Sequence, residues 1–402
     1  MQMKNKNGGV KKNMKRLGIF FSHPNQHHSV MFKHLSHISD LDTRIYYYDF
    51  GSLKGAYDPG YGNSEKWDVD LLSGTRSKVL PNLLRGQQIS QFRQFNPRII
   101  GALLRGRFDA VFVSGYVSPS NWLVLLGAKL LGTQVLYQSD TNILDEQRKT
   151  HSRFKRILRR AFLNRVDTFL PIGDKNREVY TELGYDPKQM EWCPCPVDVE
   201  RFQHFHQDEG TAAICADLRR QYGIPPEAKI VVFCGKLIER KRPQDLIEAI
   251  KLLNRDDVYA LLIGSGPMEE ELRASLEPND HVRITGFVNQ SRMPHHILLG
   301  SVGVVCSEWD PHPLVVTEFA SCGLPVVSSH FCGMWGEHDI LRPEENGFVY
   351  SCGHVAELAR SLAKLLDDRA LRERMGERSL ELSTTQSALL GARIIADRVR
   401  SL

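Results

Sequence analysis

The chain has 402 residues, enough for two or three domains of ordinary size. Hydrophobic residues make up 42% of the chain and charged residues 25%, which excludes a disordered, collagen-like or coiled-coil protein. Its eight cysteines lie between Cys193 and Cys352, too sparse for a disulfide-rich secreted scaffold. We therefore expect reduced thiols in a cytoplasmic protein.

The net charge of +5 is concentrated in two segments. Residues 1–16 carry six Lys and Arg and residues 147–165 carry eight, with no acidic residue in either segment. The rest of the chain holds 38 Lys and Arg against 47 Asp and Glu. This pattern favours local contact with an anionic surface over nucleic-acid binding. We interpret residues 1–16 as a disordered basic leader.

The first half of the chain alternates short apolar runs with helical patterns. Strands are predicted at residues 17–21, 43–48, 110–113, 133–137 and 168–172, and helices at 121–131 and 175–183. This alternation is typical of βαβ units in a parallel sheet. The most apolar stretch, residues 122–131, is about half as long as a membrane span.

A polar segment without a clean period, residues 198–221, precedes a second series. Strands are then predicted at residues 230–233, 259–263, 282–284, 302–305 and 326–328, and helices at 244–253, 268–276, 314–321 and 355–366. Residues 371–402 form one long amphipathic helical pattern. The sequence thus predicts two doubly wound α/β domains, with a ligand cleft at the carboxyl ends of their strands.

The strongest chemical signal lies in residues 307–327. A buried strand leads into a proline-rich loop, and a helix is predicted to begin at Pro313, where a missing N–H costs nothing. The free amides of Leu314 and Val315 could then bind an anion. Glu318, one turn later, could accept hydrogen bonds from vicinal hydroxyls such as those of a ribose. A solvent-exposed Glu is the alternative.

A second signal follows the strand that ends at Gly235. Lys236 and Lys241 bracket the loop before the next helix. Two ammonium groups there could neutralise a diphosphate without a metal ion. A solvated, charged turn is the alternative.

Together these segments resemble the retaining glycosyltransferases of family four (glycosyl transferases group 1), which have the two-domain GT-B fold. Lys236 and Lys241 match the Arg and Lys of that family's diphosphate loop, Gly-Arg-Leu-x-x-x-Lys-Gly. Asp310 and Glu318 match its Glu-x7-Glu motif, and FASCGLPV follows as in the family. The resemblance implies that Glu318 binds the donor ribose. It also implies that Asp310 and the two lysines act on the transferred sugar and the leaving diphosphate.

The resemblance extends to two further donor-side residues. Gly264 lies in a Gly-rich turn, LIGSGP, and Phe287 in the segment TGFV, whose backbone meets the nucleobase in this family. A dinucleotide fingerprint would need Gly at position 269, where the chain has Glu. The expected parts are two Rossmann-like domains facing a central cleft, residues 17–200 and 201–380, and a helix crossing back to the first domain, residues 381–402.

Acceptor-side residues are expected in the loop after the first strand, SHPNQHH. This loop is similar to a subset of the family in which it reads His-Pro-x-Gln. His23, Gln26 and His27 are therefore candidates for holding acceptor hydroxyls or the departing phosphate. Two of the three histidines could instead cap the following helix. A metal site of His23, His27 and His28 is a third alternative.

Asp140 follows the strand at 133–137, where the family usually has a His. It could accept a hydrogen bond from the acceptor hydroxyl and so take part in catalysis. Alternatively, it could be the N-cap of the next helix.

The basic segment at 147–165 is predicted to be an amphipathic helix. One face carries Phe154, Ile157, Leu158, Ala161 and Phe162, and the other carries Lys149, Arg153, Arg156 and Arg160. The apolar face could pack on the sheet. Alternatively, the helix and the basic leader could dock on anionic lipids.

We thus expect an enzyme that transfers a sugar from a nucleoside-diphosphate sugar to an acceptor hydroxyl with retention, without a metal or other cofactor. The expected setting is surface polysaccharide or glycolipid biosynthesis, on a glycan or lipid-linked acceptor. Attachment to the inner face of the cell membrane is a further expectation. A GT-B sugar-nucleotide epimerase or hydrolase, and a non-catalytic nucleotide-sugar-binding protein, are the alternatives. The donor nucleobase and sugar, the linkage and the oligomeric state stay open.

Overall fold

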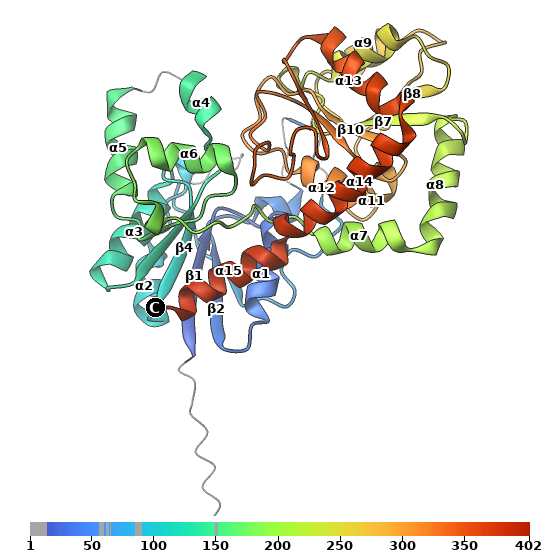
Figure 1. The fold of residues 1–402 in the computed structure, drawn as a ribbon. Helices are drawn as coiled ribbons and strands as arrows, with labels where there is room; N and C mark the ends of the chain where they lie inside the picture. The colour runs from blue at the N-terminus through green and yellow to red at the C-terminus, as the bar shows by residue number, and fades with distance from the viewer. Residues whose placement is uncertain (1–13, 56–59, 62–63, 65, 85–90, 149–151) are drawn as a thin grey trace, which may run out of the picture.

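The computed structural model describes residues 14–402 except 56–59, 62–63, 65, 85–90 and 149–151. Within this part of the chain, two α/β domains are each built on a parallel sheet of six strands (Figure 1). This arrangement confirms the predicted fold class. Buried strands in such sheets are covered on both faces, which is why they read as continuous apolar runs in the sequence.

The first sheet has the strand order β3-β2-β1-β4-β5-β6. Its strands are β1 (Lys15–Phe21), β2 (Leu41–Tyr47), β3 (Ser77–Val79), β4 (Ala110–Ser114), β5 (Gln134–Gln138) and β6 (Thr168–Phe169). The helices of this domain are α1 (His28–Ser36), α2 (Arg98–Gly106), α3 (Pro119–Leu130), α4 (Ile143–Arg148), α5 (Arg153–Leu163) and α6 (Asp174–Glu182). Side chains of α1 fill one face of the sheet, and side chains of α2, α3 and α5 fill the other.

The second sheet has the order β12-β11-β10-β7-β8-β9. Its strands are β7 (Lys229–Cys234), β8 (Val258–Ile263), β9 (Val282–Ile284), β10 (Val302–Val305), β11 (Val326–Ser329) and β12 (Gly347–Tyr350). The helices after β6 are α7 (Val199–Gln207), α8 (Glu209–Tyr222), α9 (Pro243–Leu253), α10 (Glu269–Ala274), α11 (Met293–Ile297), α12 (Val315–Ser321), α13 (Val355–Asp367), α14 (Arg369–Ser383) and α15 (Ala388–Arg400). Helices α9 and α13 cover one face, and α11 and α12 cover the other.

Three predicted boundaries are wrong. Strand β1 begins at Lys15, so residues 15 and 16 belong to the fold and not to a leader; the Arg16 amide donates to Asp109 Oδ2 at 2.7 Å. Residues 1–13, the rest of the predicted leader, lie outside the described residues. The polar segment after residue 198 forms helices α7 and α8. The long C-terminal pattern is two helices, because the turn Thr384–Gln386 separates α14 from α15.

The chain crosses between the domains twice, and the two crossings lie side by side. Val197 and Ser387 form a parallel β-bridge, and the Ala388 amide donates to the Val197 carbonyl at 2.9 Å. Helix α15 then packs against α1 in the core of the first domain (Figure 1). Five of its residues are completely buried there: Ala388, Ala392, Ile395, Ala396 and Val399.

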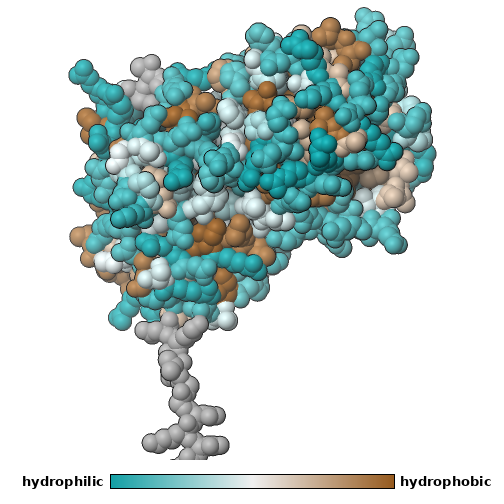
Figure 2. Space-filling view, viewed as in Figure 1, coloured by the Kyte–Doolittle hydropathy of each residue, from teal (hydrophilic) through white to brown (hydrophobic). Residues whose placement is uncertain are grey.

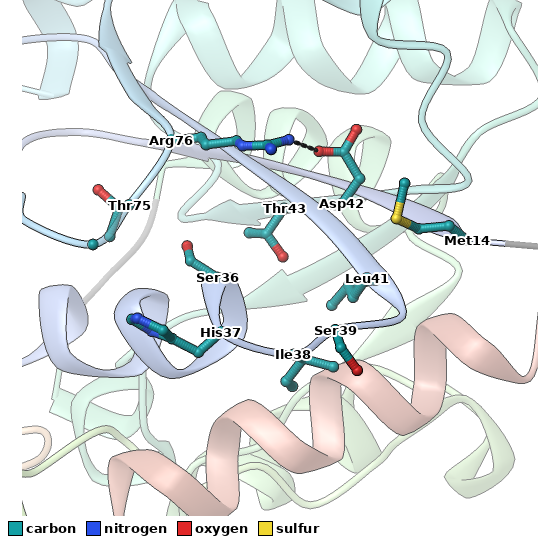
Figure 3. A pocket seen from close by; sticks show the side chains of 11 residues that line it. Met14, Ser36, His37, Ile38, Ser39, Leu41, Asp42, Thr43, Thr75 and Arg76 are labelled. Carbon is teal, nitrogen blue, oxygen red and sulfur yellow. Dashed lines mark hydrogen bonds and ion pairs between the residues drawn. The ribbon is translucent and has the colours of Figure 1, made fainter.

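A pocket of about 380 Å³ opens at the amino ends of β1 and β2 (Figure 3). Met14, His37 and Thr75 line it, and Asp42 pairs with Arg76 across it. Ligands of open parallel sheets bind at the carboxyl ends of the strands. This pocket is therefore separate from the candidate site. In the described part of the chain, every helix is too short or too polar to cross a bilayer.

Candidate active site

Two predicted donor-side residues form an ion pair at the carboxyl ends of β7 and β10. Lys241 lies in the short helical turn Glu239–Lys241 and contacts the Asp310 carboxylate through its ammonium group. Their side chains are 18% and 9% exposed. The two residues meet because β7 and β10 are neighbouring parallel strands. A cation and an anion thus lie together where the resemblance expects the donor's diphosphate and sugar.

The loop that carries Asp310 is held from both domains. Asn142, in the first domain, donates from Nδ2 to the Pro311 carbonyl at 2.9 Å. Arg240 donates to the Trp309 carbonyl, and its guanidinium carbon lies 4.7 Å from the centroid of the Trp309 ring. These contacts fix the backbone on both sides of the catalytic candidate.

His312, in the same loop, is buried and uncharged. Burial lowers the pKa of its imidazole to about 4, although the nearby Asp310 charge raises it. Its Nε2 atom has no hydrogen-bond partner in the described structure. His312 therefore contributes shape and a neutral polar atom to this loop, and no positive charge.

Glu318 is buried on α12, so the solvent-exposed alternative for this residue is wrong. Burial raises the pKa of its carboxyl to about 7, and the positive charge of Arg201 opposes that rise. Helix α12 begins at Val315, and Leu314 is its N-cap. The predicted start at Pro313 is therefore two residues too early. Within the described part of the chain, no backbone carbonyl accepts from the amides of Leu314 and Val315, so these amides are free as predicted.

The Cys234 thiol, at the end of β7, lies within electrostatic range of Glu318 and Lys241. Burial raises its pKa well above the usual range, Glu318 raises it further, and Lys241 lowers it. Glu318 and Lys241 therefore flank the same strand end. The structure brings these two predicted residues together.

Gly235 and Gly264, which follow β7 and β8 at the carboxyl ends of the strands, pack backbone against backbone. A Cβ atom on Gly264 would lie 1.9 Å from the Gly235 carbonyl oxygen, so a side chain cannot be accommodated there. Gly264 also donates to the Gly286 carbonyl at 3.0 Å. The result is a flat backbone surface beside Phe287, which also lines a pocket of about 360 Å³.

Two aromatic residues of the first domain reach this surface, and the sequence did not reveal them. The Tyr61 ring centroid lies 5.4 Å from that of Phe287 and 4.7 Å from the Lys236 ammonium. The Trp67 ring centroid lies 6.0 Å from that of Phe287. Lys236 therefore contacts an aromatic face and is not a solvated turn residue.

The acceptor-side candidates lie after β1, as expected. His23 Nδ1 is 3.0 Å from Ser22 Oγ, and Gln26 Nε2 is 3.3 Å from His27 Nε2. Burial lowers the pKa of both His23 and His27, to about 4 for His27, so both rings are neutral at pH 7. This loop offers hydrogen-bonding groups to an acceptor and no fixed charge.

The two alternatives for the histidines are not supported. Asn25 caps α1, because its Oδ1 accepts from the His27 and His28 amides at 3.2 and 2.9 Å. His27 is the N-cap residue of α1, but its side chain makes no capping hydrogen bond, so capping by a histidine side chain is wrong. Among the described residues, no group of three His, Cys, Asp or Glu is arranged to hold a metal ion.

Asp140 lies on the surface just after β5. It is not the N-cap of the next helix, because Asn142 Oδ1 accepts the Asp145 amide at 2.8 Å. The carboxylate still acts on its surroundings, since its charge raises the pKa of the Cys195 thiol in addition to the larger effect of burial. Its predicted role toward the acceptor stays a prediction.

Arg201 links the two sides of the candidate site, and sequence reasoning assigned it no role. It donates to the carbonyl and side-chain oxygens of Gln290 at 2.6 and 3.0 Å. Burial is the larger effect on both His27 and Glu318: it lowers the pKa of His27 and raises the pKa of Glu318. The charge of Arg201 lowers the pKa of both groups. Arg201 is therefore near both the acceptor loop and the ribose candidate.

Two family models match the two domains of this chain. Residues 216–381 match the model "Glycosyl transferases group 1", and residues 60–196 match "Glycosyl transferase 4-like domain". The chain belongs to the group 1 glycosyl transferases of the GT-B fold, as the sequence motifs predicted.

Individual relatives are distant. The alpha-D-kanosaminyltransferase of Streptomyces kanamyceticus is 29% identical over 46% of this chain and 48% of its own length. The lipopolysaccharide core biosynthesis glycosyltransferase LpsE of Rhizobium meliloti is 31% identical over 43% of this chain and 49% of its own. The chain thus matches about half the length of these relatives. The crystal structure of Anabaena HepE in complex with UDP is 16% identical and covers 97% of this chain and all of its own, with a TM-score of 0.74.

Proposed function

We propose that the protein transfers a sugar from a nucleoside-diphosphate donor to a hydroxyl of a glycan or lipid-linked acceptor, with retention of the anomeric configuration. The observation that carries this proposal is the Lys241–Asp310 ion pair beside the buried Glu318, at the carboxyl ends of the second sheet. The similarity to a protein solved with UDP and with UDP-glucose supports a nucleotide-sugar donor.

The chemistry needs a stabilised leaving diphosphate and a stabilised oxocarbenium-like centre. Lys236 and Lys241 supply positive charge for the diphosphate, and the helix start at Leu314 supplies free amides. Asp310 supplies negative charge beside the sugar. The donor's own phosphate oxygen takes the acceptor proton, and the two lysines contribute positive charge to the diphosphate without a metal ion.

Thermal unfolding with UDP, GDP, ADP and CMP tests the donor site. A nucleotide at a hundredfold excess over Kd stabilises the folded state by about 2.7 kcal/mol. One diphosphate should raise the unfolding temperature of the wild type and of the control Glu209→Ala, on the exposed surface of α8, but not of Glu318→Ala. If none of them stabilises the wild type, the donor site does not exist.

Turnover distinguishes transfer from the alternative activities. A transferase releases nucleoside diphosphate from the donor sugar only when an acceptor is present, whereas a hydrolase or epimerase turns the donor over alone. The anomeric proton coupling of the first-formed product, measured by NMR, reports retention or inversion. Equal donor consumption with and without acceptor would favour the hydrolase or epimerase.

We further propose that the first domain docks on an anionic membrane. Helices α2, α3 and α5 contain no Asp or Glu. Seven large apolar residues are exposed on these helices and at the end of α3: Ile100, Leu104, Leu126, Leu130, Leu131, Phe154 and Ile157. Hydrophobic spots are scattered among hydrophilic surface along the left edge of Figure 2, the side on which Figure 1 labels α3 and α5. The end of α5, including Phe162, packs on the sheet, whereas Phe154 and Ile157 are exposed, so the predicted packing of the apolar face is confirmed only for that end. Apolar side chains among basic ones suit an anionic lipid surface.

One basic residue of the predicted membrane segment is used elsewhere. Arg148 donates to the Glu308 carbonyl and to its Oε1 at 3.0 Å, so it joins the two domains.

Membrane docking is tested by flotation with vesicles that contain or lack phosphatidylglycerol. Wild type should bind only the anionic vesicles, and Phe154→Ser/Ile157→Ser should bind weakly. Equal binding to neutral vesicles would contradict the proposal.

A further inference from the structure

A segment of the first domain is anchored on the donor side of the second domain. Asp68, between β2 and β3, accepts from the Ser291 amide at 3.0 Å and from the Ser291 hydroxyl. The Asp68 amide donates to Asn289 Oδ1 at 3.2 Å, and Asn289 Nδ2 donates to the Lys66 carbonyl at 2.8 Å. Asn289 and Ser291 follow the nucleobase segment by only a few residues. This anchor therefore holds the first domain beside the candidate base site.

Tyr61, which also lies between β2 and β3, contacts residues of the candidate donor site. Its carbonyl accepts from the Ser265 hydroxyl, in the Gly-rich turn after β8, at 3.0 Å. Its ring meets Phe287 edge to face, with an interplanar angle of 85°. The Lys236 ammonium lies over the same ring. Tyr61 thus contacts Lys236, which is predicted to bind the diphosphate, and also contacts the Gly-rich turn and the nucleobase segment.

The aromatic rings leave no room for a base between them. The Tyr61, Trp67 and Phe287 centroids are 5.4 to 6.3 Å apart in pairs, which is the spacing of rings in direct contact. A planar base on Phe287 must therefore replace one of these contacts. A diphosphate on Lys236 likewise competes with the Tyr61 ring, because the ammonium gains more from phosphate oxygens than from an aromatic face.

We propose that Tyr61 overlaps the donor-nucleotide site and that the nucleotide must displace its ring to bind. This inference rests on the proposed donor function. A site that is open in only a fraction of molecules binds with an affinity reduced by that fraction. Tyr61 therefore sets the apparent affinity for the donor. The Asp68 anchor raises the occupancy of the site by Tyr61.

Titration calorimetry with UDP, GDP and ADP tests the competition on the full-length protein. Tyr61→Ala removes a cation–π contact and two edge-to-face ring pairs, each worth a factor of a few in an equilibrium. We expect this variant to bind the preferred diphosphate about fivefold more tightly than wild type, which corresponds to about 1 kcal/mol. Asp68→Ala should also bind it more tightly, because the anchor is lost.

The matched variant is Tyr61→Phe, which keeps the ring and should bind like wild type. Weaker binding by Tyr61→Ala would overturn the proposal, since the ring would then hold the nucleotide. Unchanged binding would also overturn it, because the ring would then lie outside the site. Either result, with wild type binding normally, leaves the proposed donor function intact. Absence of binding by wild type and Tyr61→Ala alike would overturn both. Unfolding temperatures of the ligand-free variants verify that each one folds.

Discussion

Replacing Glu318 by Gln should make the protein more stable and less able to bind its donor. Burial raises the pKa of this carboxyl from 4.5 to about 7. Between these two values the folded state holds a proton that the unfolded state releases, so the wild type loses stability as the pH rises through this range. The amide side chain of the variant cannot ionise, and the variant therefore escapes this loss.

The magnitude follows from the size of the shift. One pKa unit corresponds to 1.36 kcal/mol, so the stability advantage of Glu318→Gln should grow by about 2 to 3 kcal/mol between pH 5 and pH 8. Urea unfolding of wild type and variant at the two pH values measures it. The exposed residue Glu209, changed to Gln, is the control for the loss of a surface carboxylate.

Nucleotide binding should change in the opposite direction. Hydrogen bonds from ribose hydroxyls to a carboxylate are stronger than those to an amide, so Glu318→Gln should bind the diphosphate about tenfold more weakly at pH 8. If the stability difference between the two proteins is the same at pH 5 and pH 8, Glu318 titrates as an exposed carboxyl does. The burial argument would then be refuted.

Three further outcomes are expected. Lys241→Ala should lower the unfolding free energy by about 3 kcal/mol, because Asp310 stays buried without its cation; Lys241→Ala/Asp310→Asn should recover most of this loss in urea unfolding. Asn142→Ala should cost about 1 to 2 kcal/mol in the same assay, since it removes both the cap of α4 and the contact with Pro311, whereas Asn142→Ser should keep the cap and lose only the contact. Turnover in excess EDTA should equal turnover with added Mg²⁺, and a loss of activity on chelation would contradict the metal-free proposal.

The fold was largely predictable because most strands of both sheets are buried on both faces and therefore apolar. The edge strands β3 and β12 escaped prediction. Strand β3 is only Ser-Lys-Val, with no fully buried residue, and carries no apolar run. Helices α7 and α8 escaped because few of their residues are buried, which leaves no periodic apolar face. The break before α15 depends on Ser387, whose hydroxyl caps the new helix, and a continuous helical pattern hides it.

Motif spacing predicted the donor-side residues, because each motif is local in sequence. Lys241 and Asp310 are 69 residues apart, and only the neighbouring positions of β7 and β10 make them an ion pair. Arg201 and Tyr61 could not be assigned from the sequence, because their roles come from contacts between domains. A capping residue such as Asn25 could have been found, since Asn at a helix start is a local signal.

The paired crossings between the domains limit how this protein can be divided. Helix α15 follows the whole second domain in the chain, yet its buried side chains complete the hydrophobic interior of the first domain. A fragment truncated after residue 200 would therefore lack α15, the helix that completes its hydrophobic core. To express the halves separately, a designer would fuse α15 to the N-terminal piece through a new linker. The core of the first domain is thus complete only after the second domain has been translated.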